Sequence, residues 1–449
     1  MHYQRRVLEK KFKEYLKIFP VVGIIGPRQS GKSTLLQEVL PSYTYVTFDD
    51  FQSVEFFRSD PVRFFETFCN HVIFDEVHKV PEIFNAIKLA VDQDRENYGK
   101  FVLSSSGALF TKFFVISPRQ SPGVERSELG SYFTNTDPVP IVQPRELSRR
   151  PNNEKFCKQS TGQFALQKQV SESLAGRIGM LSLLPFQFSE IPEALHEASI
   201  YQGGYPELVN RGYAHSEEWF GAYLETYLDK DIRSVYRIGD MRDFRRFLTL
   251  LAGNISQLLN LSRFASELGV AVNTIKQWIS VLEASYAIFL LQPYHDRKGK
   301  RLTKSPKVYF WDTGLASYLT GIQTKKQYES SPLVGLLFEN YIMAEVHKWM
   351  LHTQQRLDAS FLRTSTGDEI DLILSSPQKT TLIEIKSGST FKFPMVQLLQ
   401  KYRSENEDMM LVYRGESREL GPDLAVKNYS SFLRELSATS RPPFGVSVH

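Results

Sequence analysis

Eight consecutive residues combine glycines, a lysine and a serine at a spacing that suits phosphate binding. They are Gly26, Pro27, Arg28, Gln29, Ser30, Gly31, Lys32 and Ser33, and Thr34 follows them. The segment fits G-x-x-x-x-G-K-[ST], a loop whose backbone N–H groups and lysine surround nucleotide phosphates while its hydroxyl binds Mg²⁺. An ordinary glycine turn is the alternative.

The flanking segments favour phosphate binding. Residues 21–25 form a short apolar run that is typical of a buried strand, and residues 34–40 have helical character up to Pro41. A strand, a glycine-bounded loop and a helix N-terminus together direct backbone N–H groups toward an anion. We therefore predict an ATP site at residues 26–34 in which Lys32 neutralises phosphate charge.

Two adjacent carboxylates, Asp75 and Glu76, follow the apolar run at residues 71–74. In an open parallel sheet, ligands bind at the carboxyl ends of the strands. We expect Asp75 and the Ser33 hydroxyl to hold Mg²⁺, and Glu76 to orient and deprotonate the attacking water. A solvated strand end is the alternative. Another predicted strand, residues 100–105, ends in hydroxyls that either contact the γ-phosphate region or simply begin a loop.

Several segments beyond these motifs carry a wider resemblance. They are residues 19–36, 72–82, 171–177, 184–186, 203–207, 227–232 and 385–388. In these segments the chain resembles the AAA-type ATPases of bacteria and archaea that carry a C-terminal domain of unknown function. The resemblance covers nearly the whole chain, and it implies an ATP- and Mg²⁺-dependent P-loop ATPase.

One segment, residues 106–159, departs from that family pattern. Prolines recur among Ser, Asn and Arg without a lasting helical or strand period, so we predict an irregular insertion; a functional lid is the alternative. Because the insertion follows the strand at 100–105, it could impair hydrolysis. A helix is predicted over 163–177. Its last residue, Arg177, is a candidate for stabilising transition-state charge, in cis or from a neighbouring subunit of an oligomer, or else a surface arginine.

The middle of the chain predicts a helix-turn-helix followed by two strands. Ser262 caps a first helix that Gly269 ends, a second helix spans 273–283, and strands follow at 288–294 and 307–312, which together predict a winged helix. The turn between the strands is basic. Its cations are Arg297, Lys298, Lys300, Arg301, Lys304 and Lys307. They either neutralise DNA phosphates or form a solvated hairpin tip on a domain that makes protein contacts.

The C-terminal third places acidic residues around a predicted strand pair. Asp371 lies near the start of one strand, while Glu384 and Lys386 share one face of the next. This arrangement resembles the core of the PD-(D/E)xK nucleases, a fold also found in archaeal junction resolvases. The resemblance implies a second Mg²⁺ held by Asp371 and Glu384, with Glu339 as a further carboxylate and Lys386 polarising water. A related fold kept only for binding is the alternative.

Composition limits the remaining possibilities. The formal net charge is only +4, so any nucleic-acid surface must be local. Cys69 and Cys157 are too few and too distant for a disulfide framework or a metal site. No apolar run approaches the length of a membrane-spanning helix, and the charged N-terminus does not suit a signal peptide, so we expect a cytoplasmic protein without a membrane partner.

We therefore predict an α/β protein with three domains. Residues 1–200 form a parallel-sheet P-loop ATPase domain, residues 201–325 a helical and winged helix-turn-helix domain, residues 326–437 a restriction-endonuclease-like domain, and residues 438–449 a disordered tail. The predicted function is Mg-dependent ATP hydrolysis that controls a nuclease-like module acting on DNA. The alternative is a nucleotide-dependent switch or scaffold that binds a protein or DNA partner without nuclease activity.

Overall fold

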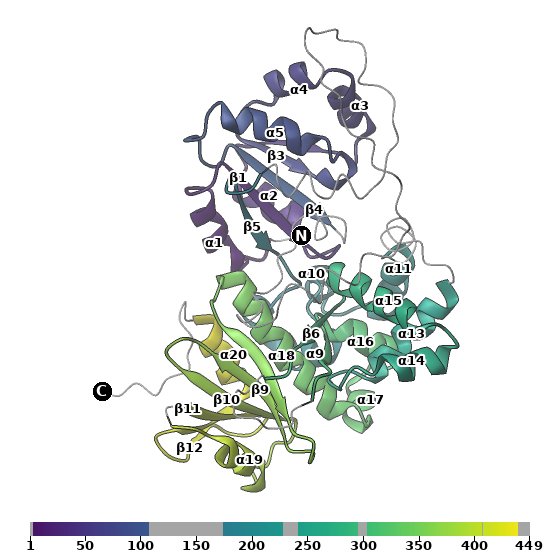
Figure 1. Cartoon of the computed structure of the whole chain (residues 1–449), viewed down its shortest axis with the longest axis vertical. Helices are drawn as coiled ribbons and strands as arrows, with labels where there is room; N and C mark the ends of the chain where they lie inside the picture. The colour runs from purple at the N-terminus through teal and green to yellow at the C-terminus, as the bar shows by residue number, and fades with distance from the viewer. Residues whose placement is uncertain (1–2, 107–173, 228–240, 295–302, 406, 439–449) are drawn as a thin grey trace, which may run out of the picture.

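Five parallel strands form the sheet of the amino-terminal domain (Figure 1). The computed structural model describes residues 3–106, 174–227, 241–294, 303–405 and 407–438. The strands are β1 (Val21–Gly26), β2 (Thr44–Thr47), β3 (Val72–Asp75), β4 (Phe101–Ser106) and β5 (Ile178–Ser182), in the order β2–β3–β4–β1–β5. β4 therefore lies between the strand that precedes the glycine-rich loop and the strand that ends at Asp75.

Helices cover both faces of this sheet, which explains why β1 and β3 are buried along their whole length. They are α1 (Leu8–Tyr15), α2 (Lys32–Val39), α3 (Phe51–Ser59), α4 (Pro61–Thr67) and α5 (Ile83–Asp92), with a short 3₁₀ turn η1 (Val77–Lys79). Leu8, Phe12 and Leu35 of α1 and α2 pack with Val22 and Ile24, whereas Phe64 and Phe84 of α4 and α5 belong to a core on the opposite face.

The helix predicted over 163–177 falls almost entirely outside the described residues, as does the insertion at 106–159. Residues 174–177 are described and form a turn in which the Arg177 amide donates to the Leu174 carbonyl, 3.0 Å away. This turn leads directly into β5.

A helical region follows β5. Its elements are η2 (Phe188–Glu190), η3 (Glu193–Leu195), α9 (His196–Gln202), α10 (Pro206–Asn210), α11 (Ser216–Tyr227), α13 (Met241–Gly253), α14 (Leu261–Leu268) and α15 (Val272–Ala284). Gly269 ends α14 with a φ of 69°, in agreement with the sequence, but Asn260 caps the helix instead of Ser262. The Asn260 carboxamide accepts from the Arg263 amide at 3.0 Å, so the predicted cap was wrong by two residues.

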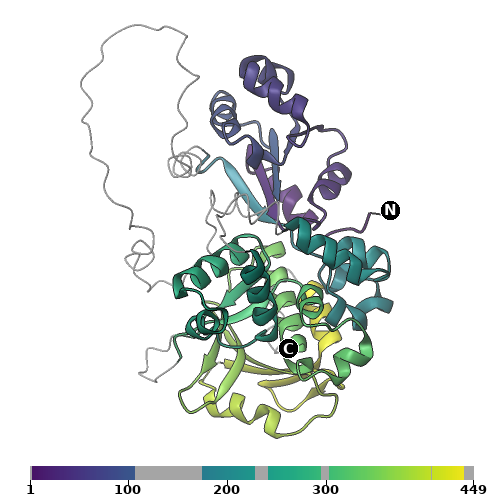
Figure 2. The same cartoon turned by 90° about the vertical axis from the view of Figure 1, so that its right-hand side faces the viewer.

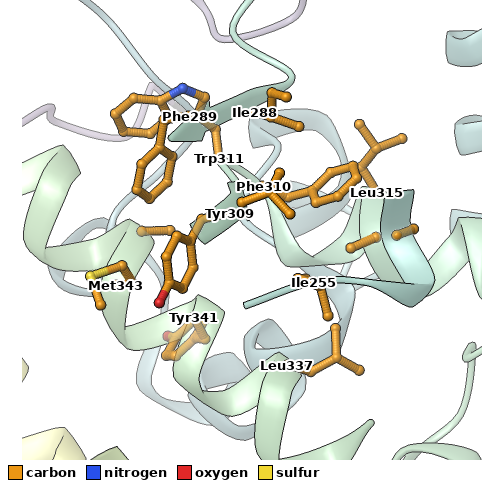
Figure 3. Packing of buried hydrophobic residues seen from close by; sticks show 14 of the residues in the cluster. Ile255, Ile288, Phe289, Tyr309, Phe310, Trp311, Leu315, Leu337, Tyr341 and Met343 are labelled. Carbon is orange, nitrogen blue, oxygen red and sulfur yellow. The ribbon is translucent and has the colours of Figure 1, made fainter. Parts of the chain in front are cut away.

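An antiparallel hairpin follows α15. It consists of β6 (Ile288–Leu291) and β7 (Lys307–Phe310), after which come α16 (Thr313–Leu319) and α17 (Lys325–Ser330). The hairpin does not stand apart: Tyr309, Phe310 and Trp311 pack in one hydrophobic core with Tyr341 and Met343 of the next helix (Figure 3). The core therefore continues across the predicted domain boundary at residue 325.

A six-stranded mixed sheet forms the C-terminal region. Helix α18 (Val334–Thr353) precedes β8 (Asp358–Arg363), β9 (Glu369–Ser375), β10 (Thr380–Lys386), α19 (Pro394–Tyr402), β11 (Glu407–Tyr413), β12 (Arg418–Glu419), β13 (Leu424–Asn428) and α20 (Tyr429–Ala438). The strand order is β12–β13–β11–β10–β9–β8. Figures 1 and 2 show the two large sheets toward opposite ends of the molecule, with the helical region and α18 between them. Within the described residues, no helix is long and apolar enough to cross a membrane.

Candidate functional site

The glycine-rich loop connects the end of β1 to the start of α2. Gly26 has a φ of 154°, and a Cβ there would lie 2.0 Å from the Leu183 carbonyl oxygen, so only glycine fits. Gly31 has a φ of 88°, in the region that favours glycine, and it begins α2. The two glycines thus shape a loop that ends at a helix N-terminus, a position whose backbone N–H groups and dipole suit an anion.

Lys32 extends back over this loop. Its side chain is buried, and its ammonium donates to the Gly26 carbonyl at 3.1 Å and to the Pro27 carbonyl at 2.7 Å. The loop therefore holds a positive charge beside its own backbone, next to the N-terminus of α2. That position suits neutralisation of nucleotide phosphates, as the sequence predicts.

Ser33 and Asp75 meet across two elements of the domain. The Ser33 hydroxyl donates to Asp75 Oδ2 at 2.7 Å, and the Tyr45 hydroxyl also donates to this oxygen. The Glu76 amide donates to the other carboxylate oxygen at 3.0 Å. A hydroxyl and a carboxylate are the oxygen ligands that Mg²⁺ accepts beside nucleotide phosphates, so these residues fit the predicted metal.

Glu76 adopts a strained backbone conformation, with a φ of 54°. Its carboxylate lies 3.1 Å from His78 Nδ1, which is also 3.0 Å from the Ser105 hydroxyl at the end of β4. Strain of this kind at a non-glycine residue concentrates at functional sites. His78 and Ser105 therefore hold the side chain of the predicted base. Ser105 is one of the hydroxyls at the end of the strand predicted over 100–105, and its contact with the γ-phosphate region stays a prediction.

The structure does not bring Arg177 to the glycine-rich loop. The Arg177 carbonyl accepts from the Val21 amide at the start of β1, whereas the loop follows the other end of that strand. Its guanidinium pairs with Asp92 at 2.8 Å. This geometry contradicts a role in cis, so a neighbouring subunit is the one setting in which the prediction still stands.

Sequence reasoning missed Arg6, which lies against the loop. Its guanidinium donates to the Ser30 carbonyl at 2.8 Å and to the Leu184 carbonyl at 2.6 Å, and it pairs with Glu190 at 3.1 Å. Arg6 is almost fully buried. No local pattern marks it, because its partners come from distant parts of the chain.

A second polar cluster forms where the C-terminal motif predicts it. The Lys386 ammonium lies 2.5 Å from Glu384 Oε1 and 3.7 Å from Asp371 Oδ2. Asp371 Oδ2 also accepts from the Ile385 amide at 2.9 Å. Glu339 of α18 belongs to the same cluster, so the structure brings all four predicted residues together. We call this group, with Lys307 and Glu369, the carboxylate cluster.

Lys307 occupies a place that the sequence did not predict. It is 1% exposed, and its ammonium lies 2.9 Å from Glu339 Oε1, in contact with Glu369, and 3.9 Å from Asp371 Oδ1. Its prediction as a member of an exposed basic patch was wrong. Lys304 is exposed, and the cations at 297–301 lie outside the described residues.

Several groups of the carboxylate cluster have pKa values far from their ordinary ones. Burial, with a contribution from nearby Asp371, raises the pKa of Glu339 to about 7 and that of Glu384 to about 8. Burial alone would lower the pKa of Lys307, but Glu339, Asp371 and Glu369 outweigh it and raise this pKa above its ordinary value. Both lysines of the cluster therefore stay charged.

The predicted second metal does not fit this cluster. Across the described residues, no group of three His, Cys, Asp or Glu side chains is arranged to hold a metal ion. An ammonium already lies among the carboxylates that a metal would need. A metal at the C-terminal sheet therefore takes no part in the function proposed below.

Comparisons with known proteins divide the chain into three parts. Residues 19–114 match a family model described as an AAA domain, and residues 193–326 and 334–427 match two models described as domains of unknown function, DUF8612 and DUF4143. The amino-terminal part is a P-loop ATPase domain. The C-terminal match agrees with the domain of unknown function that the sequence resemblance implied, while the winged-helix and nuclease-like assignments stay predictions.

Two other proteins match this chain over most of its length. The uncharacterized proteins Rv2008c of Mycobacterium tuberculosis and Mb2031c of Mycobacterium bovis are each 25% identical to it over 425 residues, which span 92% of this chain and 81% of theirs. Among solved structures, the Walker-type ATPase PABY2304 of Pyrococcus abyssi matches with a TM-score of 0.42 and 15% identity, over 71% of this chain and 96% of its own.

Proposed function

We propose that the chain binds ATP with Mg²⁺ at residues 26–34 and hydrolyses it. The observation that carries this proposal is the Ser33 hydroxyl 2.7 Å from Asp75 Oδ2, beside the buried ammonium of Lys32. Mg²⁺, when bound with the nucleotide, supplies charge neutralisation for the phosphates. Ser33 and Asp75 would hold it, and Lys32 would neutralise the remaining phosphate charge.

In the proposed reaction, Glu76 takes the proton of the attacking water. His78 and Ser105 support this role, because they keep the Glu76 carboxylate at the carboxyl end of the sheet. The Tyr45 hydroxyl supports Asp75 in the same way. Burial, first, and the bond to Asp75 raise the pKa of Tyr45 above its ordinary value, so this hydroxyl stays a donor.

Nucleotide binding tests the proposal directly. Replacing Lys32 by alanine should abolish binding of a fluorescent ATP analogue in an anisotropy titration, because the phosphates lose their buried cation. Asp75→Asn should instead weaken the Mg²⁺-dependent part of the affinity and keep the metal-free part. Lys10→Ala, at an exposed position of α1, is the matched control and should bind as the wild type does. Unchanged affinity in Lys32→Ala would refute the site.

We further propose that nucleotide state reaches the C-terminal region through Arg6. Arg6 joins Ser30 of the loop to Leu184 and Glu190. Residues 184–190 are also hydrogen-bonded to α18. The Leu184 amide donates to His352 Nε2 at 3.2 Å, the Phe188 amide to Glu345 at 2.6 Å, and the Lys348 ammonium to the Phe186 carbonyl at 3.0 Å.

These bonds form a continuous route from the loop to the helix that also carries Glu339. A route of this kind supports coupling only if both ends respond to the same ligand. Hydrogen exchange of α18 should slow when ATP binds to the wild type. In Arg6→Ala, ATP binding should leave α18 exchange unchanged; an equal response in this variant would exclude Arg6 as the connection.

For the C-terminal region, we propose the switch or scaffold without nuclease activity. Lys307 favours this alternative over the nuclease, because its ammonium lies among the acids that metal-dependent cleavage would use. Plasmid and branched DNA should stay intact with Mg²⁺ or Mn²⁺. Cleavage by the wild type that disappears in Asp371→Ala or Lys386→Ala would instead support the nuclease hypothesis.

Contact of the basic turn with DNA remains part of the proposal. Its test is whether DNA stimulates ATP hydrolysis, and whether exchanging the four cations at 297–301 for serine removes that stimulation. No stimulation by any DNA would instead point to a protein partner.

A further inference from the structure

The carboxylate cluster joins three elements of the chain around one ammonium. Lys307 comes from β7, Glu339 from α18, and Glu369 and Asp371 from β9. The hydroxyl of Tyr309, also on β7, donates to Glu339 Oε1 at 2.7 Å. Glu339 thus receives two donors from the same strand, and all three side chains are buried.

The charges of this cluster are nearly balanced without a metal. Four acidic side chains take part, those of Glu339, Glu369, Asp371 and Glu384. Burial raises the pKa of Glu384 to about 8, so this group is largely protonated at neutral pH and adds little negative charge. Three cations oppose the acids: Lys307, Lys386 and Arg363, the last of which pairs with Glu369 at 2.7 Å. A divalent ion would raise the positive charge to five, and it would need carboxylate oxygens at about 2.1 Å on the side where the Lys307 ammonium lies.

We propose that Lys307 is the permanent cation of this cluster, in the place where related nuclease folds are expected to hold a metal. The ammonium replaces the ion and at the same time fixes the hairpin to α18 and β9. The cluster is thus a structural connection between the middle and C-terminal regions.

Backbone contacts next to Lys307 support this connection. The Tyr294 amide donates to the Phe361 carbonyl at 2.7 Å, and the Phe361 amide donates to the Gln292 carbonyl at 3.2 Å. The Thr303 amide donates to the Arg363 carbonyl at 3.1 Å. Both arms of the hairpin therefore bond to β8, and Lys307 lies where such bonds keep its side chain directed at the acids.

Burial explains why this lysine cannot be replaced easily. A buried ammonium is costly unless carboxylates and good geometry compensate for lost hydration. Lys307 has three acidic neighbours within 4 Å, and their negative charge compensates for the lost hydration of its ammonium. The ammonium in turn compensates for the lost hydration of these acids. Removing the ammonium leaves several buried carboxylates without their cation, and a divalent ion is the ligand that best restores the balance.

Binding of Mn²⁺, followed by electron paramagnetic resonance without nucleotide, tests the proposal. All proteins are full-length and carry Asp75→Asn, which weakens the metal ligands at the ATP site. The protein with native Lys307 should show no Mn²⁺ affinity that depends on Asp371. The double variant Lys307→Met with Glu369→Gln removes one charge of each sign, so the cluster should remain foldable.

This double variant should gain Mn²⁺ binding, tighter by about tenfold or more than in the protein with native Lys307. Adding Asp371→Asn should abolish the gain. Lys304→Met, at an exposed position three residues earlier, should gain nothing.

Two results would overturn the proposal. One is Asp371-dependent Mn²⁺ binding in the protein with native Lys307, which can be measured even if the double variant fails to fold. The other is a folded double variant that takes up no metal, because Lys307 would then not be what excludes it.

Discussion

The ATP site and the carboxylate cluster both combine lysine with acidic residues, but the lysines have different partners. At the ATP site, Lys32 donates to loop carbonyls, while Asp75 accepts from the hydroxyls of Ser33 and Tyr45. In the cluster, Lys307 and Lys386 contact carboxylates directly. Hydroxyl partners leave the carboxylate charge available for a cation, whereas ammonium partners neutralise it. The same residue types therefore favour metal binding in one region and oppose it in the other.

The largest expected effect separates chemistry from binding at the ATP site. Glu76→Gln should lower the rate of ATP hydrolysis by about 10²- to 10⁴-fold, because the water loses its general base. Affinity for ATP should stay the same, since Lys32, Ser33 and Asp75 are untouched. Phosphate release and anisotropy titrations measure the two quantities.

Glu82→Gln is the matched control for this experiment, because Glu82 is exposed in the same stretch of the chain. It should hydrolyse ATP as the wild type does. A Glu76→Gln protein with undiminished turnover would show that the base lies elsewhere. The ATP site would then differ from the carboxylate cluster in its binding partners but not in a catalytic role for Glu76.

The next effect concerns the stability of the cluster. Lys307→Ala should lower the free energy of unfolding by about 3–5 kcal/mol, because it leaves buried carboxylates without their cation. Urea unfolding, followed by tryptophan fluorescence, measures the change. Lys304→Ala, at an exposed neighbouring position, should stay within about 0.5 kcal/mol of the wild type. A small effect at Lys307 would mean that the cluster does not depend on its ammonium.

The ATP site was predictable from sequence because its determinants are local. Gly26, Gly31 and Lys32 are neighbours in the chain, and their conformations follow from the strand and helix on either side. Asp75 lies farther away, but a short apolar run ending in acids is itself a local pattern. The match of residues 19–114 to an AAA-domain model supports a P-loop ATPase domain, whereas ATP hydrolysis and the roles of the individual residues stay predictions.

Only part of the carboxylate cluster was predictable from local sequence patterns. Asp371 and Glu384 were found because the motif places them on two adjacent strands, but Glu369 was missed and Lys307 was grouped with the basic residues that precede it. One signal favoured burial: Lys307 begins a strand whose next residues, Val308 to Trp311, are apolar, and it shares a face with Tyr309. Its acidic partners come from residues 339–371, and no pattern within the hairpin indicates that contact.

Arg6 illustrates the same limit at the ATP site. Its partners are Ser30 and Leu184, 24 and 178 residues away along the chain. Only the folded arrangement of α1, the loop and the segment after β5 brings them together. The connection between the two sites was therefore not predictable, although most of the elements at either end were.

A smaller effect tests the segment that connects the two regions. Burial, followed by the charges of Arg6 and Lys348, holds the pKa of His352 well below its ordinary value. Because Nε2 accepts from the Leu184 amide, the neutral ring uses Nδ1–H to donate to Gln187. Below pH of about 6.5 the unfolded state binds a proton that the folded state does not, so acid favours unfolding by about 1.4 kcal/mol per pH unit.

The wild type should therefore lose stability relative to His352→Gln as the pH falls from 7.5 to 5.5. Comparing the two proteins at each pH cancels the titration of the other groups. His215→Gln, at an exposed position, should follow the wild type throughout. A constant difference between wild type and His352→Gln would show that this histidine is not held neutral.

The smallest effect compares the two sites through one matched substitution. Tyr45 and Tyr309 each donate a hydroxyl to an acid, Asp75 at the ATP site and Glu339 in the cluster. Tyr309 is fully buried and Tyr45 is not. Tyr309→Phe should therefore destabilise the chain by about 1 kcal/mol more than Tyr45→Phe, because water cannot reach the fully buried position of the Tyr309 hydroxyl to replace the lost bond. Tyr45→Phe should mainly weaken the affinity for Mg²⁺ with ATP, since Asp75 loses a donor that orients it. Equal losses of stability in urea unfolding would mean that the two hydroxyls contribute alike, and the division between a hydroxyl-bonded metal ligand and an ion-paired acid would fail.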